Sequence, residues 1–233
     1  MSDRFEVDRE FLFLGRTFEE YLDLFELTVD DVTGGPILDC PGGPSSFTAL
    51  ASALGTETTA VDPMYDRSLD ELEAECSESI ERNMEQVREK RDLFEFDYYG
   101  GVEGRGRFLR AAAERFLSDY ERNPDRYVPA SLPSLPFADD AFALTLSANL
   151  LFLYDDRLDE AFHVDAAREL ARVTGGELRV FPLASLALER SDLVDPVADA
   201  LREDGHGVEF VPVDYDLRPT AEEMLVVDCG RDR

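Results

Sequence analysis

Two acidic residues, Asp39 and Asp62, each end a short apolar stretch and could together bind a polar small molecule. Asp39 ends "ILD" and is followed by "CPGGPSS", where Gly42 and Gly43 allow close approach of a ligand and unusual φ values. Asp62 ends "TTAVD". If both stretches are neighbouring parallel strands, the carboxylates meet at the edge where open α/β sheets bind ligands. The alternative is that both acids simply face solvent in an acid-rich protein.

The loop after Asp39 differs from the loops that bind phosphates. It contains neither GxGxxG nor a lysine of the P-loop type, which weakens a nicotinamide-dehydrogenase interpretation. The loop could still bind a ligand whose end is zwitterionic, because such a ligand needs no phosphate clamp. Ser45 and Ser46, after Pro44, can cap a following helix. The later "GVEGRG" at 101–106 follows no strand, so we predict a flexible loop there.

Apolar runs and helical periodicity predict alternating strands and helices. Strands are expected at 34–40, 56–62, 126–132, 141–153, 177–183, 208–216 and 222–229. Helices are expected at 17–27, 45–55, 66–94, 108–120, 157–173 and 192–204. Alternation predicts an α/β fold with a doubly wound, mainly parallel sheet. The last two strands follow one another directly, which predicts a hairpin and an antiparallel terminal strand.

We expect a single domain over residues 1–233. Thr17 and Glu20 have the spacing of a capping box, so residues 1–33 should form an N-terminal helical cap. Residues 96–120 are interpreted as a lid-like insertion. Both segments are rich in aromatic residues and would cover the ligand crevice, where they would govern the choice of substrate.

Seven strands ending in an antiparallel hairpin, with an acid-and-glycine turn after the first strand, resemble the class I S-adenosylmethionine-dependent methyltransferases, over about residues 35–229. The first loop of that family reads D/E-x-G-x-G-x-G. In "ILDCPGGPSSF", Asp39 takes the acidic position and Gly43 the second glycine, while Pro41 and Ser45 replace the other two.

Three longer segments resemble a little-characterised prokaryotic branch of predicted methyltransferases in which a DCP-G-P-S loop is usual. They are "RTFEEYLDLF", "ILDCPGGPSSF" and "LPFADDAFALTLSANLLFLYDDRLDEAFH". The resemblance implies a seven-stranded Rossmann-like sheet with S-adenosylmethionine as cofactor. It also implies that Asp62 holds the ribose, that Ser131 and Leu132 contact the adenine, and that Asn149 ends the fourth strand beside the cofactor.

The full set of residues expected to bind the cofactor is Asp39, Cys40, Gly42, Gly43, Ser45, Asp62, Pro63, Met64, Ser131, Leu132 and Asn149. The residues expected to face the methyl acceptor are Arg16, Tyr21, Tyr98, Tyr99 and Tyr154. Arg16 is alternatively a partner for the cofactor carboxylate. The acceptor is expected to be a small, partly apolar molecule. Departures from the family pattern, including Ser131 and Ala143 where acids are usual, leave a second hypothesis of a non-catalytic or regulatory cofactor-binding module.

The charge of the chain is extreme. It has 52 acidic and 23 basic residues, a net charge of -29, and Lys90 as its only lysine. With 16 Phe and 8 Tyr, a packed core is expected rather than disorder. The acid-rich, lysine-poor composition resembles that of proteins from extreme halophiles such as halophilic archaea, where molar salt screens self-repulsion. It argues against a nucleic-acid partner, because no basic stripe is present to neutralise phosphates.

The remaining composition gives further expectations. Cys40, Cys76 and Cys229 are far apart, and only His163 and His206 are histidines, so we expect neither a disulfide framework nor a metal site. No stretch approaches the roughly 20 apolar residues of a membrane span, and no apolar leader is evident. We therefore expect a cytoplasmic protein with no membrane partner, as a monomer or homodimer.

Overall fold

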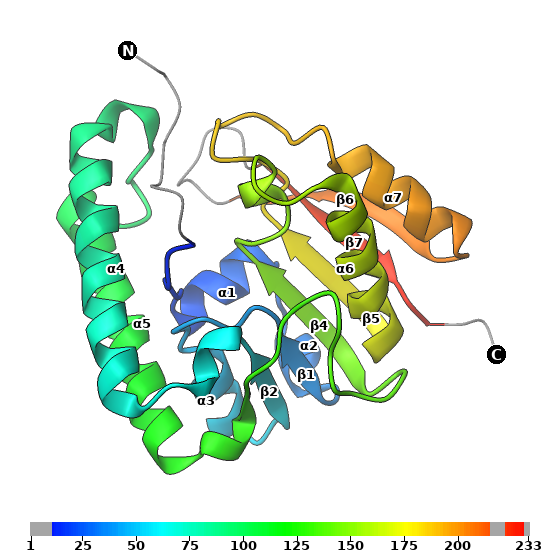
Figure 1. The fold of residues 1–233 in the computed structure, drawn as a ribbon, viewed down its shortest axis with the longest axis horizontal. Helices are drawn as coiled ribbons and strands as arrows, with labels where there is room; N and C mark the ends of the chain where they lie inside the picture. The colour runs from blue at the N-terminus through cyan, green and yellow to red at the C-terminus, as the bar shows by residue number, and fades with distance from the viewer. Residues whose placement is uncertain (1–10, 215–221, 231–233) are drawn as a thin grey trace.

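The computed structural model describes residues 11–214 and 222–230, in which seven strands form one twisted sheet (Figure 1). The strands are β1 (Ile37–Asp39), β2 (Thr58–Val61), β3 (Tyr127–Val128), β4 (Phe142–Ala148), β5 (Thr174–Phe181), β6 (Gly207–Pro212) and β7 (Glu223–Asp228). Their order across the sheet is β3-β2-β1-β4-β5-β7-β6. The strand order reverses between β1 and β4, and this switch point is where open sheets bind ligands.

The pairing confirms the predicted topology. The strands β3, β2, β1, β4 and β5 are mutually parallel, whereas β7 pairs antiparallel with both β5 and β6. The connection from β6 to β7 is therefore the expected hairpin. The fold is a doubly wound α/β sheet of seven strands with an antiparallel terminal strand.

Helices cover both faces of the sheet. They are α1 (Phe18–Leu24), α2 (Val29–Thr33), α3 (Phe47–Ala53), α4 (Leu69–Glu89), α5 (Val102–Arg122), α6 (Glu160–Val173) and α7 (Val194–Glu203). Ile37 and Leu38 are neighbours in β1, and their side chains point to opposite faces. Ile37 packs with residues of α1, α2 and α3, and Leu38 packs with residues of α6 and α7.

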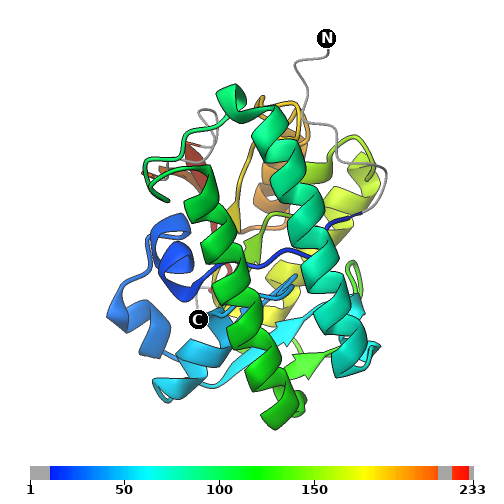
Figure 2. The same cartoon turned by 90° about the vertical axis from the view of Figure 1, so that its left-hand side faces the viewer.

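The long helices α4 and α5 form a hairpin beside the β2–β3 edge, and Figure 2 shows them side by side. A third apolar cluster lies between them and this edge of the sheet. Leu72 and Met84 of α4 and Phe116 of α5 are buried in it, together with Tyr127 of β3. Residues 96–120, interpreted from the sequence as a lid-like insertion, comprise the turn of the hairpin and most of α5.

The prediction of a flexible loop at 101–106 is wrong. The helix α5 begins at Val102, so Gly104 and Gly106 lie inside it. A Cβ on Gly104 would lie 1.8 Å from the carbonyl oxygen of Tyr99, and one on Gly106 would contact the Met84 side chain at 3.4 Å. The glycines allow close packing of this helix against its own turn and against α4, rather than flexibility.

Other predicted boundaries need correction. The third strand is only two residues long, and the next residue, Pro129, has no N–H group with which to continue the ladder. The strand expected over 141–153 ends at Ala148, since Asn149 adopts a left-handed φ of 56° and the short 3-10 helix η4 (Phe152–Tyr154) follows. Parts of the expected cap (1–10), of the expected strand over 208–216 and of the hairpin loop lie outside the described residues.

Candidate functional site

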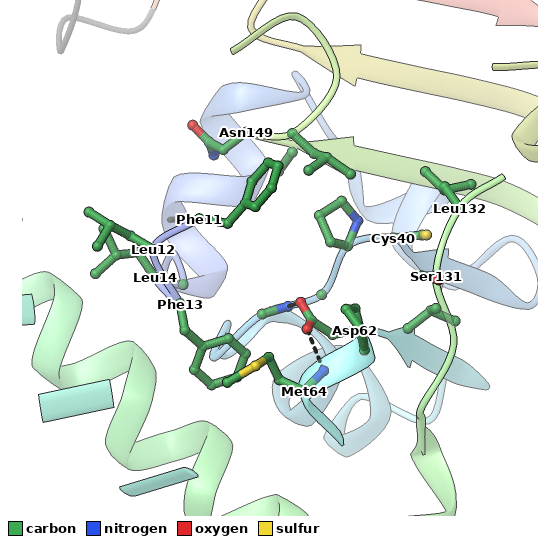
Figure 3. A pocket seen from close by; sticks show the side chains of 18 of the residues that line it. Phe11, Leu12, Phe13, Leu14, Cys40, Asp62, Met64, Ser131, Leu132 and Asn149 are labelled. Atoms are coloured by element: carbon green, nitrogen blue, oxygen red, sulfur yellow. Dashed lines mark hydrogen bonds between the residues drawn. The ribbon is translucent and has the colours of Figure 1, made fainter. Parts of the chain in front are cut away.

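A cavity of about 720 Å³ lies at the carboxyl edge of β1, β2 and β4 (Figure 3). Its volume is in the range of small-molecule sites, which is roughly 300–1,000 Å³. Its wall combines residues from separate parts of the chain: Phe11–Arg16, Tyr21, Cys40–Gly43, Val61–Met64, Arg67, Glu75, Ala130–Leu132, Ala148–Leu150, Tyr154, Leu158 and Phe162. The sheet thus gathers most of the predicted site residues around one space.

The first loop is bonded to the end of β2. The Gly42 N–H donates to the carbonyl of Val61 at 2.8 Å, and the Tyr65 hydroxyl donates to the carbonyl of Gly43 at 2.7 Å. Gly43 has a φ of 51°, which is one of the unusual values that the sequence analysis anticipated for this glycine. Gly42 is needed for another reason: a Cβ there would lie 2.6 Å from the Tyr65 hydroxyl and 2.8 Å from Cβ of Ala60. The protein's own packing, and not a ligand, demands this glycine.

Asp62 faces the cavity as predicted. Its Oδ1 accepts the N–H of Met64 at 2.9 Å, drawn as a dashed line in Figure 3, and its Oδ2 accepts the N–H of Gly43 at 3.2 Å. Burial raises the pKa of this carboxyl to about 6, against the two N–H groups, which lower it. At neutral pH the group is a carboxylate, and its oxygens have lone pairs left for ligand hydroxyls.

Asp39 does not line the cavity, contrary to expectation. Its side chain is fully buried, and the Tyr21 hydroxyl donates to its Oδ1 at 2.9 Å. Within residues 11–214 and 222–230, its Oδ2 has no hydrogen-bond partner. Burial raises the pKa of Asp39 to about 8, and the nearby charge of Asp62 contributes to the rise. Tyr21, predicted to face the acceptor, lines the cavity and is the residue bonded to this acid.

Cys40 and Ser45, also predicted to bind the cofactor, differ in position. Cys40 lines the cavity, but burial, with help from Asp39, raises the pKa of its thiol well above the usual value. It is therefore a thiol rather than a reactive thiolate. Ser45 lies outside the cavity wall, because its hydroxyl accepts the N–H of Phe47 at 3.0 Å in the turn that leads into α3.

Tyr98 and Tyr99 do not face the cavity either. The hydroxyl of Tyr98 donates to Asp23 at 2.7 Å, and that of Tyr99 donates to Glu20 at 2.6 Å. Both carboxylates belong to α1. The two tyrosines therefore attach the α4–α5 hairpin to α1, and the placement predicted for them beside the acceptor is wrong.

Arg16 lines the cavity beside the start of α1. Its side chain is buried, its Nη1 donates to the carbonyl of Gly15 at 3.1 Å, and its Nε lies 3.6 Å from Oε1 of Glu20. The charge of Arg16 is close enough to Tyr21 to oppose the rise in that hydroxyl's pKa, which burial and Asp39 cause. A cation therefore stands at the end of the cavity nearest the end of β1.

Residues 11–15, here called the strap, line the cavity as a non-helical segment, within the region expected to form a helical cap over the crevice. The strap crosses between the α4–α5 hairpin and the sheet (Figure 2). Its middle is fixed where the N–H of Phe13 donates to the Ser79 hydroxyl at 3.1 Å. Its end presses on the first loop, because a Cβ on Gly15 would lie 2.0 Å from the carbonyl oxygen of Pro44. The apolar run "FLFLG" before the capping box was the signal available for it.

The remaining wall has a mixed and an apolar part. Pro63, Met64, Ser131 and Leu132 line the part beyond β2, as predicted. Beyond β4, Asn149 and Tyr154 line the cavity, also as predicted, but most of their surroundings were missed. Those missed side chains are Phe11, Leu12, Leu150, Leu158 and Phe162. The end of the cavity beyond β4 is thus largely apolar.

Phe11 and Tyr154 form an aromatic pair at this apolar end. Their ring centroids are 4.7 Å apart with an edge-to-face orientation. Phe11 is 49% exposed, and the guanidinium of Arg157 lies over both rings, 5.8 Å from that of Phe11 and 4.9 Å from that of Tyr154. The pair joins the strap to the segment after β4.

His163 lies at the base of this region, in α6. It is fully buried, and both ring nitrogens lie 2.8 Å from carbonyl oxygens, Nδ1 from Asp159 and Nε2 from Leu151. With both ring nitrogens in contact with backbone carbonyls and no exposed surface, it is a structural residue. It connects α6 to the segment that carries Tyr154.

No protein-family profile matches the chain. The uncharacterized protein MJ0045 of Methanocaldococcus jannaschii is 29% identical over 220 residues, which cover 94% of this chain and 96% of that protein. Magnesium protoporphyrin IX methyltransferase from Synechocystis PCC 6803, solved with bound SAM, is 10% identical; the match covers 91% of this chain and 77% of that one, with a TM-score of 0.49. The PH0226 protein from Pyrococcus horikoshii OT3 is 12% identical, with coverages of 91% and 90% and a TM-score of 0.49.

None of the helices in the described part of the chain combines the length and apolar character needed to cross a membrane.

Proposed function

We propose that this protein binds S-adenosylmethionine and transfers its methyl group to a small, partly apolar acceptor. The observation that carries the proposal is the ionised Asp62, which faces a cavity of about 720 Å³ at the switch point of a doubly wound sheet. A carboxylate at the end of the second strand suits the two ribose hydroxyls of a nucleoside.

The residues around Asp62 fit the rest of such a ligand. The adenine would lie between Met64 and the backbone of Ser131–Leu132, which supply apolar contact and peptide N–H groups. The methionyl end would lie along Gly43, with its carboxylate toward the guanidinium of Arg16. The cavity needs no phosphate clamp for this ligand, in keeping with the first loop.

The sulfonium of the bound cofactor supplies the methyl group, and the leaving group departs neutral. The residues of the chain would then act mainly by positioning, which can supply several kcal/mol of the barrier reduction. The acceptor would lie beyond β4, against Leu150, Leu158 and Phe162, with Asn149 and Tyr154 as its polar contacts. This wall favours a small, partly apolar molecule over a nucleic acid, as does the net charge of -29. We also propose that the protein acts in the cytoplasm, as expected in the sequence analysis.

Calorimetry in molar KCl tests the cofactor. We expect S-adenosylmethionine and S-adenosylhomocysteine to bind, and NAD to bind far more weakly. If neither S-adenosylmethionine nor S-adenosylhomocysteine binds, the proposal is wrong. Transfer is tested separately, by incubating the protein with methyl-labelled cofactor and a small-molecule extract. Binding without labelled product would instead support a non-catalytic or regulatory module.

A further inference from the structure

A buried chain of polar contacts connects the α4–α5 hairpin to the cavity. The hydroxyl of Tyr99, in the hairpin turn, donates to Oε1 of Glu20 at 2.6 Å. The same oxygen lies 3.6 Å from Nε of Arg16, which lines the cavity. All three side chains are at least nine-tenths buried. The hairpin therefore reaches the site through Tyr99, although Tyr99 itself does not line the cavity.

Glu20 is held from two sides. Its Oε2 accepts the N–H of Thr17 at 2.8 Å in the capping box of α1, and Tyr99 holds its Oε1. A carboxylate fixed in this way sets the position of the guanidinium beside it, because an ion pair buried from water is poorly screened. Burial raises the pKa of Tyr99 to about 12, so its hydroxyl remains a donor at neutral pH.

The Arg16 guanidinium favours an anionic ligand group at its end of the cavity. The side chain is buried and lines the cavity, and its Nε lies 3.6 Å from Oε1 of Glu20. A guanidinium has five N–H donors in a planar fork, so a carboxylate can bind it through two parallel hydrogen bonds. The arrangement therefore suits a ligand carboxylate on the cavity side of Arg16.

We propose that Tyr99 is a positioning residue that acts through Glu20 to hold the Arg16 guanidinium toward the carboxylate of a bound ligand. This inference rests on the proposed function, since the ligand carboxylate nearest the end of β1 would be that of the methionyl group. A carboxylate on the methyl acceptor has the same chemistry. The experiment below separates the two sources by using cofactor analogues without an acceptor.

The test compares Tyr99→Phe with Tyr98→Phe. Each variant removes one hydroxyl that is bonded to a carboxylate of α1, but only the partner of Tyr99 contacts Arg16. Each protein is titrated with S-adenosylhomocysteine and with 5′-methylthioadenosine, which lacks the amino-acid group. For Tyr99→Phe we expect Kd for S-adenosylhomocysteine to rise about 3- to 10-fold, the range of one hydrogen bond, with Kd for methylthioadenosine unchanged. For Tyr98→Phe we expect neither Kd to change.

Three results would overturn the inference. If Tyr99→Phe raises Kd equally for both ligands, Tyr99 has a merely structural role. If it leaves Kd for S-adenosylhomocysteine unchanged, Arg16 does not bind the methionyl carboxylate, and an acceptor carboxylate is the other source of the anion. Wild-type protein that binds neither nucleoside overturns the proposed function as well, which distinguishes that failure from the other two. Arg16→Gln provides the second readout: it should abolish the preference for S-adenosylhomocysteine, and adding Tyr99→Phe to it should cost no further affinity.

Discussion

The Tyr21 hydroxyl donates a 2.9 Å hydrogen bond to Oδ1 of Asp39, and this bond links the acid that ends β1 to a residue of the cavity wall. Tyr21 lines the cavity, whereas Asp39 is fully buried and does not line it. Burial raises the pKa values of both groups. The acid predicted to face the ligand is therefore bonded to a tyrosine of the cavity wall, and it holds a proton to unusually high pH.

Replacing this acid with asparagine should change how stability depends on pH. The pKa of Asp39 is about 8 in the folded protein, against an ordinary value of 3.8. Between these values the folded state binds more protons than the unfolded state, so the free energy of unfolding falls as pH rises from about 4 to about 8. Asp39→Asn should remove that contribution. We expect the variant to resemble wild type at pH 4 and to be more stable at pH 8.

Denaturant unfolding of both proteins at several pH values in molar KCl measures this difference. Asp62 also contributes to the slope through its raised pKa of about 6, but it does so equally in both proteins. The difference between the two curves therefore reports on Asp39. Parallel curves for variant and wild type over this range would show that Asp39 is ionised in the folded protein.

Asp62→Ala should weaken binding of S-adenosylhomocysteine by about 1–3 kcal/mol, because a carboxylate that accepts the ribose hydroxyls would be lost. Its matched control is Asp66→Ala, an exposed acid at the end of the short 3-10 helix η1 (Pro63–Asp66), which Asp62 caps. Calorimetry should show that the Asp66→Ala control binds S-adenosylhomocysteine with wild-type affinity. Since Asp62 also accepts the N–H groups of Gly43 and Met64, Asp62→Asn is needed to separate this contribution from loop distortion. Wild-type affinity in both Asp62 variants would mean that the ribose lies elsewhere.

Much of the sheet could be predicted because its signals are local. Apolar runs that end in Asp39 and Asp62 identify neighbouring strands, and the close succession of the last two strands requires a hairpin. The capping box of Thr17 and Glu20 is present as predicted. Such features depend on residues a few positions apart, so a single sequence contains the information.

The parts of the site that were not predicted depend on packing between distant segments. Nothing near Tyr99 in the sequence shows that its hydroxyl meets Glu20, 79 residues away. Likewise, nothing near Asp39 in the sequence shows that it is fully buried and bonded to Tyr21, which lies in the preceding helix α1. The strap lacks regular hydrogen bonding of its own, so no periodicity marks it. A sequence pattern specifies which residue types meet at a sheet edge, but not which of them another segment covers.

Gly15→Ala tests the fixed position of the strap. The added Cβ would lie 2.0 Å from the carbonyl oxygen of Pro44, so either the strap or the first loop must move. We expect a loss of about 1–3 kcal/mol in the free energy of unfolding, as for other overpacked sites, together with weaker binding of S-adenosylhomocysteine. The control is Gly207→Ala in β6, whose added Cβ has its nearest neighbour at 3.3 Å. Unchanged stability and affinity in Gly15→Ala would show that the strap is free to move.

The net charge of -29 predicts that this protein needs salt to remain folded, as we propose for a halophilic protein. Raising KCl from 0.1 M to 1 M shortens the Debye length from about 10 Å to about 3 Å, which screens repulsion between surface acids.

The exposed face of α4 offers a test, because Glu81 and Glu85 are one turn apart. Like charges at this spacing destabilise a helix by about 0.2–0.5 kcal/mol per pair. The double variant Glu81→Gln/Glu85→Gln should therefore raise Tm in 0.1 M KCl and leave it nearly unchanged in 2 M KCl. An equal rise at both salt concentrations would point to helix propensity instead, and a wild-type Tm independent of KCl would contradict the halophilic interpretation.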